Sequence, residues 1–433
     1  MILKGKLDIL VPEERAAVLD GIIQNSDDGI YNYEKLRRFA SLYRHKLKAI
    51  AKKRFRREAK CQTLWIAEAL LEGSSISAEK GLAPWDVPGL SAALYCLDAF
   101  SDKRLADIAQ NALDDMREWY KNGAPQANGI ECLGQDFLYS QGLWSIEAAS
   151  CGSVALLCPN PYSQFTVSVF QILRRLDIRI DAVVIRKFTA TRALSEMARD
   201  GLAPFLKRVY QKLVLRGTDN SAATHSSISK LCEFLAPESA DVRILCEKNG
   251  VDVIFANEFT DVVPQLRMKS ADIAIFTGGG LIKRDVIEAF KDGVLNTHGG
   301  GLPQYKGMDV MEGPILEGRY RNVGLTCHFM APGIDEGPIL SKFLTSISAF
   351  PSFATFQNSI STIMPLIAVD SVLGYYSGRL QKLEQPDVGR QYYFLNPALH
   401  ELLDASFNFA HDVKAKNWID AQFDEFVDDD WTN

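Results

Sequence analysis

An asparagine and a histidine two residues apart are the first residues in this sequence that suggest chemistry. Asn296 and His298 end an apolar run that begins at Val294, and side chains two apart in a strand point to the same face of the sheet. The amide N–H of asparagine can hold a developing oxyanion, and neutral imidazole offers one donor and one acceptor near neutral pH. This pair therefore suits acyl transfer.

A third polar group lies further along the chain and must be brought to this pair. The run Val323–Met330 predicts a strand, and residues 332–337 predict a turn that carries Asp335. A carboxylate there can orient the histidine, polarise a water or take a proton from an amine. His328 lies in the apolar sequence LTCHFM of the same strand, so we expect a structural, buried hydrogen bond from it rather than catalysis.

Separated blocks of sequence around these residues carry a family resemblance. The blocks are Asn296-x-His298, Leu302-Pro303-x-Tyr305-x-Gly307, Gly324-x-Thr326-x-His328 and Gly333-x-Asp335-x-Gly337-Pro338-Ile339. In this order they resemble the catalytic domain of the formyltransferases that use 10-formyltetrahydrofolate, and the resemblance extends over about residues 153–346. It implies that Asn296, His298 and Asp335 are the catalytic set.

The same resemblance implies where the two substrates bind. It places the folate on Gly278, Gly279, Gly280, Leu281 and Ile334, and the acceptor on Gly300, Tyr305 and Lys306. Most members follow the histidine with Pro-Ser or a similar pair, whereas this chain has Gly299-Gly300, and a loop without Cβ atoms allows a flat ligand to approach closely. No metal is implied, because one histidine without a cysteine partner makes a poor ligand set.

Alternating apolar runs and helical patterns predict an α/β fold with a doubly wound, mostly parallel sheet. The resemblance implies that this sheet is a formyltransferase-like Rossmann-type core. The runs read as strands are 153–158, 180–186, 241–246, 251–257 and 271–279, with a helix predicted from Gln164 to Leu176. The first turn lacks GxGxxG, which argues against a dinucleotide.

We predict three parts along the chain. Residues 1–148 form an all-α domain of unknown function, 149–350 the catalytic domain, and 351–433 a smaller helical or mixed C-terminal region, which either covers the site or forms a homodimer contact. Apolar residues recur at helical intervals in the first part, as at positions 105, 108, 113, 116 and 119. Its basic stretch, residues 44–57, reads either as a contact for phosphate, nucleotide or lipid headgroups or as the solvated face of an amphipathic helix.

Composition limits the remaining possibilities. The 433 residues, 47% apolar and 24% charged, are typical of a folded protein of two or three domains. The net charge of −6 argues against nucleic-acid binding by the whole surface. The eight cysteines include no CxxC pair, and together with the absence of a signal peptide or a long apolar span they favour the cytoplasm and no membrane span.

The acceptor is not specified by any sharp motif. A primary amine of a small molecule is expected, and an amino sugar attached to a nucleotide is the first choice, because residues 158–186 resemble formyltransferases of bacterial surface-glycan pathways. Glycinamide ribonucleotide and initiator methionyl-tRNA are less favoured. Two alternatives stay open: a hydrolase that releases formate from 10-formyltetrahydrofolate, and a non-catalytic folate-binding scaffold or adaptor.

Overall fold

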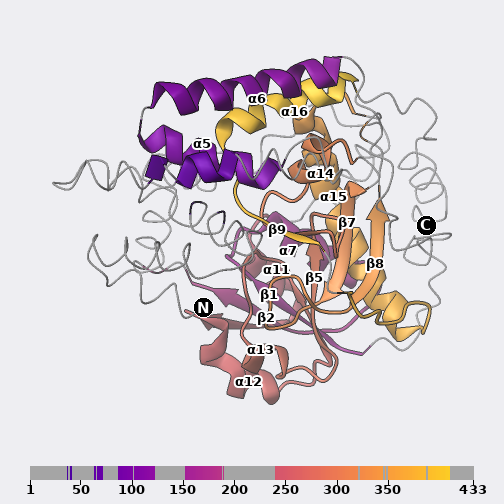
Figure 1. The fold of residues 1–433 in the computed structure, drawn as a ribbon. Coiled ribbons are helices and arrows are strands. Elements are labelled where there is room, and N and C mark those ends of the chain that lie inside the picture. The colour runs from indigo at the N-terminus through magenta and orange to yellow at the C-terminus, as the bar shows by residue number, and fades with distance from the viewer. Residues whose placement is uncertain are drawn as a thin grey trace, which may run out of the picture. The chain divides into compact units, whose positions relative to one another are not determined.

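The computed structural model describes most of residues 86–409 and short pieces before them (Figure 1). The described residues are 37, 40, 63–64, 66–71, 86–100, 102–121, 152–187, 189, 239–319, 322–344, 347, 350–386 and 389–409. The basic stretch 44–57 lies outside them.

The chain divides into two compact units that interleave along the sequence. One takes Met1–Ala127, Glu312–Arg319 and Tyr392–Ala410, and the other takes Asn128–Met311, Tyr320–Gln391 and His411–Asn433. The first is called the helical unit here and the second the sheet unit. The linear division at 148 and 350 stays a prediction, because these units follow contacts and each draws on segments far apart in sequence.

A seven-stranded sheet organises the sheet unit, in the order β3-β2-β1-β4-β5-β7-β8. The strands are β1 Val154–Cys158, β2 Ile180–Arg186, β3 Asp252–Ala256, β4 Ile273–Phe276, β5 Gly293–His298, β7 Gly324–Phe329 and β8 Ile339–Leu344. The strands from β3 to β5 pair in parallel, and β7 and β8 are antiparallel to their neighbours. The predicted fold class, a doubly wound and mostly parallel sheet, is confirmed.

The strand order reverses between β1 and β4. The chain runs outward from β1 to β2 and β3, and then returns to place β4 on the other side of β1. In such sheets ligands bind outside the carboxyl ends of the strands at the point of reversal. Residues 159–163 after β1 and residues 277–281 after β4 lie at this point.

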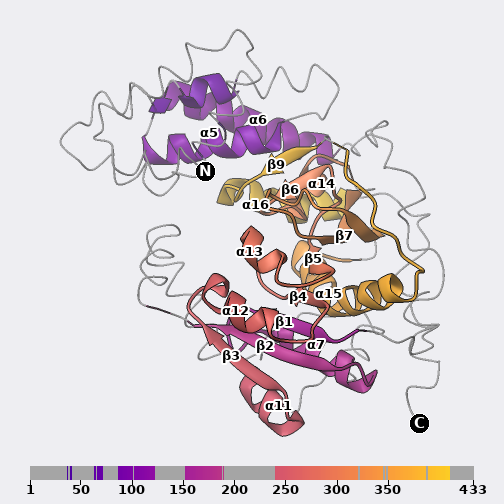
Figure 2. The same cartoon turned by 90° about the horizontal axis from the view of Figure 1, so that it is seen from below.

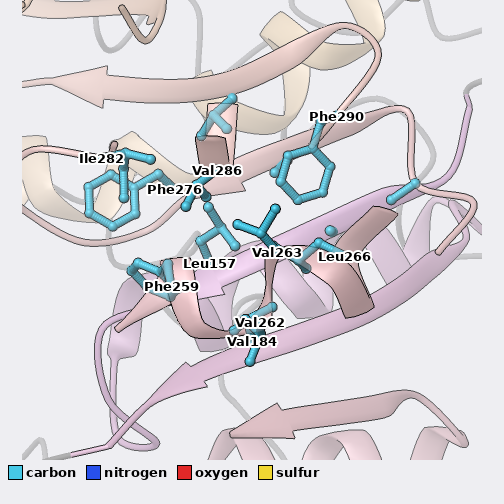
Figure 3. Packing of buried hydrophobic residues seen from close by; sticks show 14 of the residues in the cluster. Leu157, Val184, Phe259, Val262, Val263, Leu266, Phe276, Ile282, Val286 and Phe290 are labelled. Atoms are coloured by element: carbon cyan, nitrogen blue, oxygen red, sulfur yellow. The ribbon is translucent and has the colours of Figure 1, made fainter. Parts of the chain in front are cut away.

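Helices cover both faces of the sheet (Figure 2). They are α7 Gln164–Arg175, α11 Val242–Asn249, the 3-10 turn η2 Phe259–Val262, α12 Val263–Arg267, α13 Arg284–Ile287 and α15 Phe353–Tyr376. On one face, Leu157, Val184 and Phe276 from the strands pack against Phe259 and Val263 of η2 and α12 (Figure 3). On the other, α15 packs on α7, β5, β7 and β8.

Helix α15 corrects one expectation. It is long and apolar enough to span a membrane by length and composition, although the sequence was read as having no such stretch. Most of its apolar window is buried inside this unit, as in the core helix of a folded domain. Ser352 caps its start by accepting a hydrogen bond from the Thr355 N–H at 3.2 Å.

The run 241–246 was predicted to be a strand, and this is wrong. It forms the first part of α11, where Asp241 accepts from the backbone N–H of Arg243 at 2.9 Å and Gly250 ends the helix in the left-handed region, at φ 63°. The buried residues Val242, Leu245 and Cys246 are three and four apart. A short apolar run fits both periods, and the capping residues on either side select the helix.

In the helical unit, helices α5 Val87–Ala99, α6 Lys103–Lys121, α14 Glu312–Leu316 and α16 Pro397–Phe409 pack together. The Tyr95 hydroxyl donates to the Leu395 carbonyl at 2.6 Å, and the Asn396 amide donates to Asp98 at 2.9 Å. Most of the described residues before position 122 lie in helices, and the all-α domain 1–148 stays a prediction. One position of the predicted apolar face differs, because Ile108 is 46% exposed.

Candidate active site

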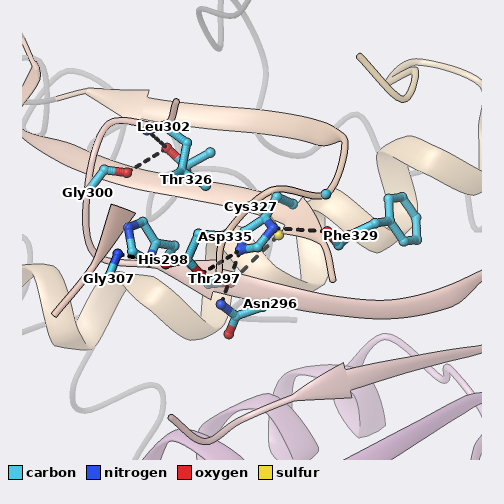
Figure 4. A network of polar contacts seen from close by, with 12 residues as sticks. Asn296, Thr297, His298, Gly300, Leu302, Gly307, Thr326, Cys327, Phe329 and Asp335 are labelled. Carbon is cyan, nitrogen blue, oxygen red and sulfur yellow. Dashed lines mark hydrogen bonds and ion pairs between the residues drawn. The ribbon is translucent and has the colours of Figure 1, made fainter. Parts of the chain in front are cut away.

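The two predicted catalytic residues of β5 meet a histidine of the neighbouring strand. β5 and β7 are antiparallel, and their register places Asn296 opposite His328 and His298 opposite Thr326. The Asn296 amide nitrogen lies 3.3 Å from Nε2 of His328. The rings of His298 and His328 are edge to face, with centroids 6.2 Å apart. Figure 4 shows Asn296 and His298 beside Asp335 in this network. Strand pairing therefore assembles the first three side chains of the cluster.

His298 has a defined tautomer when it is neutral. Its Nε2 lies 2.8 Å from the backbone carbonyl oxygen of Tyr305, and a carbonyl can only accept, so Nε2 carries the proton and donates. Nδ1 is then the nitrogen with a free lone pair, and it lies 3.6 Å from Oδ2 of Asp335. The side chain is 6% exposed. Nδ1 is therefore the atom of this ring that can take up a proton.

His328 is held in the opposite tautomer. Its Nδ1 lies 3.0 Å from the carbonyl oxygen of Phe329, so Nδ1 donates and Nε2 accepts from the Asn296 amide. Burial lowers the pKa of His328 to about 4, while the nearby Asp335 carboxylate acts against this shift. The ring is neutral at pH 7. The expected buried hydrogen bond is confirmed, and the contact with Asn296 is one that sequence reasoning missed.

The third predicted catalytic residue joins this cluster. Asp335 places Oδ2 2.8 Å from the Gly307 N–H, which donates to it, and Oδ1 3.7 Å from Nε2 of His328. Its backbone lies in the left-handed region, at φ 53°, which is uncommon for a residue with a side chain. The structure thus brings Asn296, His298 and Asp335 together around His328.

A buried threonine holds the loop that follows His298. Thr326 donates from its hydroxyl to the carbonyl of Gly300 at 2.7 Å and accepts from the Leu302 N–H at 3.2 Å. A Cβ on Gly300 would lie 2.9 Å from Val310, and one on Gly301 would lie 2.7 Å from the Asn322 carbonyl oxygen. The loop is therefore closely packed, and only glycine fits there without displacement of its neighbours.

Residues 278–281, which are predicted to bind the folate, lie at the strand-order reversal. Phe276 of β4 pairs with Asn296 of β5, so residues 278–281 leave the sheet at the same edge as His298. A Cβ built on Gly279 or Gly280 meets nothing within 4 Å, and Leu281 is 61% exposed. Residues 279–281 of this loop are therefore open, in contrast to the packed loop after His298, whereas a Cβ on Gly278 would lie 2.8 Å from the Phe276 ring. Ile334, also predicted to contact the folate, is half-buried beside Asp335 in sequence.

The residues predicted to bind the acceptor differ in accessibility. Gly300 is buried and its carbonyl is used by Thr326, and the Tyr305 side chain is 1% exposed. Tyr305 enters the cluster through its backbone carbonyl, which orients His298. Lys306 is half-buried. Their roles in acceptor binding stay predictions.

Residues 203–369 match the sequence model of the formyl transferase family, described as "Formyl transferase". The stretch includes β5, β7 and the turn with Asp335, and thus the whole cluster around His328. This part of the chain is therefore similar to a formyl transferase domain. Of the strands, β1 and β2 precede the matched stretch.

Proteins with similar sequences are named as formyltransferases. A methionyl-tRNA formyltransferase of Coxiella burnetii is 28% identical over 149 residues, which are 34% of this chain and 47% of that protein. A methionyl-tRNA formyltransferase of Myxococcus xanthus is 25% identical over 126 residues, which are 29% of this chain and 40% of that protein. This chain thus spans less than half the length of these relatives.

Solved structures with a related description also align with the chain. Glycinamide ribonucleotide transformylase 1 from Symbiobacterium toebii has 17% identity and a TM-score of 0.37, covering 60% of this chain and 98% of that one. WlaRD, described as a sugar 3N-formyl transferase with dTDP and 5-N-formyl-THF, has 15% identity and a TM-score of 0.31, covering 56% of this chain and 70% of that one.

Proposed function

We propose that this protein transfers the formyl group of 10-formyltetrahydrofolate to a primary amine of a small-molecule acceptor. The observation that carries the proposal is the convergence of Asn296, His298 and Asp335 within a formyl transferase domain. Amide, imidazole and carboxylate in one cluster provide the donor, the proton carrier and the base that acyl transfer to an amine requires.

The proposed reaction begins with attack of the neutral acceptor amine on the formyl carbon. A new C–N bond forms, and the carbonyl oxygen becomes an oxyanion. The Asn296 amide has two N–H groups, of which one donates to Nε2 of His328, and the other is available to the oxyanion. Because neutral His328 accepts this bond, it keeps the amide nitrogen, and not the amide oxygen, turned toward the cluster.

The proton of the amine then moves within the cluster. Asp335 takes it from the attacking nitrogen and passes it to Nδ1 of His298, which lies 3.6 Å from Oδ2 of Asp335. The resulting imidazolium donates from both nitrogens and stabilises the oxyanion as a nearby cation. Collapse of the intermediate breaks the bond between the formyl carbon and N10, and the proton passes to N10 of the departing tetrahydrofolate.

The open loop after β4 fits the folate. Gly279 and Gly280 leave room on the side where a Cβ would be, so a flat pterin can approach the backbone and be recognised by its N–H and C=O groups. Gly278, Leu281 and Ile334 complete the proposed folate contacts. The chemistry supplied by the folate is a formyl group activated on N10, and no metal is needed for the steps above.

We propose a nucleotide-linked amino sugar as the acceptor, bound near Gly300, Tyr305 and Lys306. Methionyl-tRNA is the second candidate, because the similar sequences above are methionyl-tRNA formyltransferases. The net charge of −6 argues against a large polyanion as the acceptor.

Cys96, Cys158, Cys246 and Cys327 are free and buried, which supports a reducing compartment such as the cytoplasm.

Mass spectrometry tests the function directly. The purified protein is incubated with 10-formyltetrahydrofolate and, separately, with amino-sugar nucleotides, amino acids, small amines and methionyl-tRNA, with one sample lacking an acceptor. A gain of one formyl group on one acceptor supports the proposal and identifies the substrate. Formate release without acceptor favours the hydrolase, and folate binding without consumption in any sample favours the scaffold.

A further inference from the structure

We propose that Gln385 is a positioning residue that holds the turn of Asp335 in its active geometry. Gln385 lies beyond the family match, which ends at residue 369, and it is not among the catalytic or binding residues inferred above. The inference rests on the proposed function, since it concerns the placement of the proposed catalytic carboxylate.

The Gln385 amide binds the turn at two points. Its Nε2 donates to the carbonyl oxygen of Asp335 at 2.9 Å and to that of Gly337 at 2.6 Å. An amide nitrogen has two hydrogens, so both are used on this turn. The orientation of the amide is also defined, because the opposite one would place Oε1 against two carbonyl oxygens. A single side chain thus fixes the backbone on both sides of Glu336.

The chain holds Gln385 in this place through backbone pairing. Leu383 and Ile339 exchange two hydrogen bonds of 2.8 Å, from each N–H to the carbonyl of the other. Ile339 begins β8 immediately after the turn. The segment that ends at Gln385 is therefore hydrogen-bonded to the start of β8. Because β8 begins just after the turn, the Gln385 side chain lies within reach of the turn.

The turn itself depends on such support. Asp335 has a φ of 53°, which side chains other than glycine rarely adopt, and such conformations persist where surrounding contacts determine them. On one side, Gly337 packs so closely that a Cβ there would lie 1.8 Å from the Phe329 carbonyl oxygen. On the other, the carboxylate accepts from the Gly307 N–H. The distances from Asp335 to His298 and His328 follow from this backbone geometry.

Substitution of Gln385 by methionine tests the assignment, with Gln381→Met as the matched control on an exposed glutamine of the same segment. Gln385→Met keeps the length of the side chain and removes both donors. We expect kcat to fall about 10- to 100-fold, because small displacements of a reacting group have effects of this size. The KM for each substrate should change less than about 3-fold, and Gln381→Met should match the wild type.

Two further measurements separate positioning from general structural support. In an Asp335→Ala background, Gln385→Met should lower kcat by less than about 2-fold, since Gln385 acts through Asp335. Gln385→Glu should be impaired at pH 8, where its carboxylate faces two carbonyls, and should regain activity as the pH falls and the protonated acid donates one hydrogen bond. Gln381→Glu should keep the pH profile of the wild type.

Hydrogen exchange gives a readout that does not need turnover. The Gly307 N–H donates to Asp335, so it should exchange about 10-fold faster in Gln385→Met than in the wild type or in Gln381→Met. If the protein neither transfers the formyl group nor releases formate, the proposed function is refuted. The exchange rate of the Gly307 N–H would still test whether Gln385 holds the turn of Asp335 in place. Wild-type kcat in Gln385→Met, an equal loss in the Asp335→Ala background, or unchanged exchange would each overturn the inference.

Discussion

Two loops leave the same edge of the sheet and are built in opposite ways. The loop after β5, residues 299–304, is packed against Val310 and Asn322 and held by the hydrogen bonds of Thr326, whereas residues 279–281 of the loop after β4 are open. The first follows His298 and leads to the Tyr305 carbonyl that orients it. The second is proposed to receive the folate. The contrast fits the proposed function, in which the protein itself positions the proton-transfer groups and the folate fills the open side.

The largest test of this contrast removes a proton carrier from the packed side. His298→Ala or Asp335→Asn should lower kcat about 10²- to 10⁴-fold, the usual range for general acid–base groups. The KM for 10-formyltetrahydrofolate should change little, because neither side chain belongs to the open loop. Steady-state kinetics measures both, and a circular dichroism spectrum checks that the fold is retained. Normal turnover by either variant would refute the assignment of the site.

The second test measures how protonation of the buried His328 changes the stability of the protein as the pH is lowered. The pKa of His328 is about 4 in the folded protein and about 6.5 in an unfolded chain. Because the pKa of His328 is lower in the folded state, the unfolded state binds more protons between pH 4 and 6.5. The contribution of neutral His328 to the free energy of unfolding is therefore fully present above pH 6.5 and is lost as the pH falls toward 4. The difference of 2.5 units corresponds to about 3 kcal/mol.

His328→Asn should abolish this contribution to the pH dependence. Burial raises the pKa of Asp370 to about 7, so this residue changes the free energy of unfolding in the opposite direction. Its contribution to stability is present at low pH and is lost as the pH rises toward 7. The comparison must therefore be between wild type and variant at each pH, by denaturant titration. Identical pH slopes for the two proteins between pH 4 and 6.5 would show that His328 is not buried in its neutral form.

The third test removes the two hydrogen bonds by which Thr326 holds the packed loop. Thr326→Val keeps the shape of the side chain but leaves the Gly300 carbonyl and the Leu302 N–H without their partner. We expect a loss of about 1 to 3 kcal/mol in the free energy of unfolding, the usual effect of unsatisfied buried groups. Thr362→Val on the exposed face of α15 is the matched control, and a loss in the control equal to that in Thr326→Val would remove the distinction.

The smallest expected effects lie in the open loop. Gly280 has a φ of 104° whereas Gly279 is not in the positive region, and neither has atoms near a built Cβ. Gly280→Ala should therefore cost about 1 kcal/mol of backbone strain and raise the KM for folate a few-fold, while Gly279→Ala should leave it within about 2-fold. Isothermal titration with a folate analogue measures the same ratio. Equal and large effects at both positions would mean that the loop is packed and not open.

Much of the site could be predicted because it depends on local sequence. Apolar runs predicted β1, β2 and β5, the spacing of Asn296 and His298 placed them on one face, and the turn around Asp335 follows from its glycines. The run 241–246 shows the limit of such reasoning, since a few apolar residues satisfy both a strand and a helix, and the caps at Asp241 and Gly250 decide between them.

By itself, the sequence determined which chemical groups are present, the type of sheet and the similarity of residues 203–369 to formyl transferases. Only the tertiary structure decided the tautomers of His298 and His328, because each depends on a carbonyl that the fold brings to the ring. It also decided that Gln385 supports Asp335 from 50 residues away. The reason is physical: periodicity encodes which face a side chain occupies, whereas hydrogen bonds between distant segments exist only once the strands have paired.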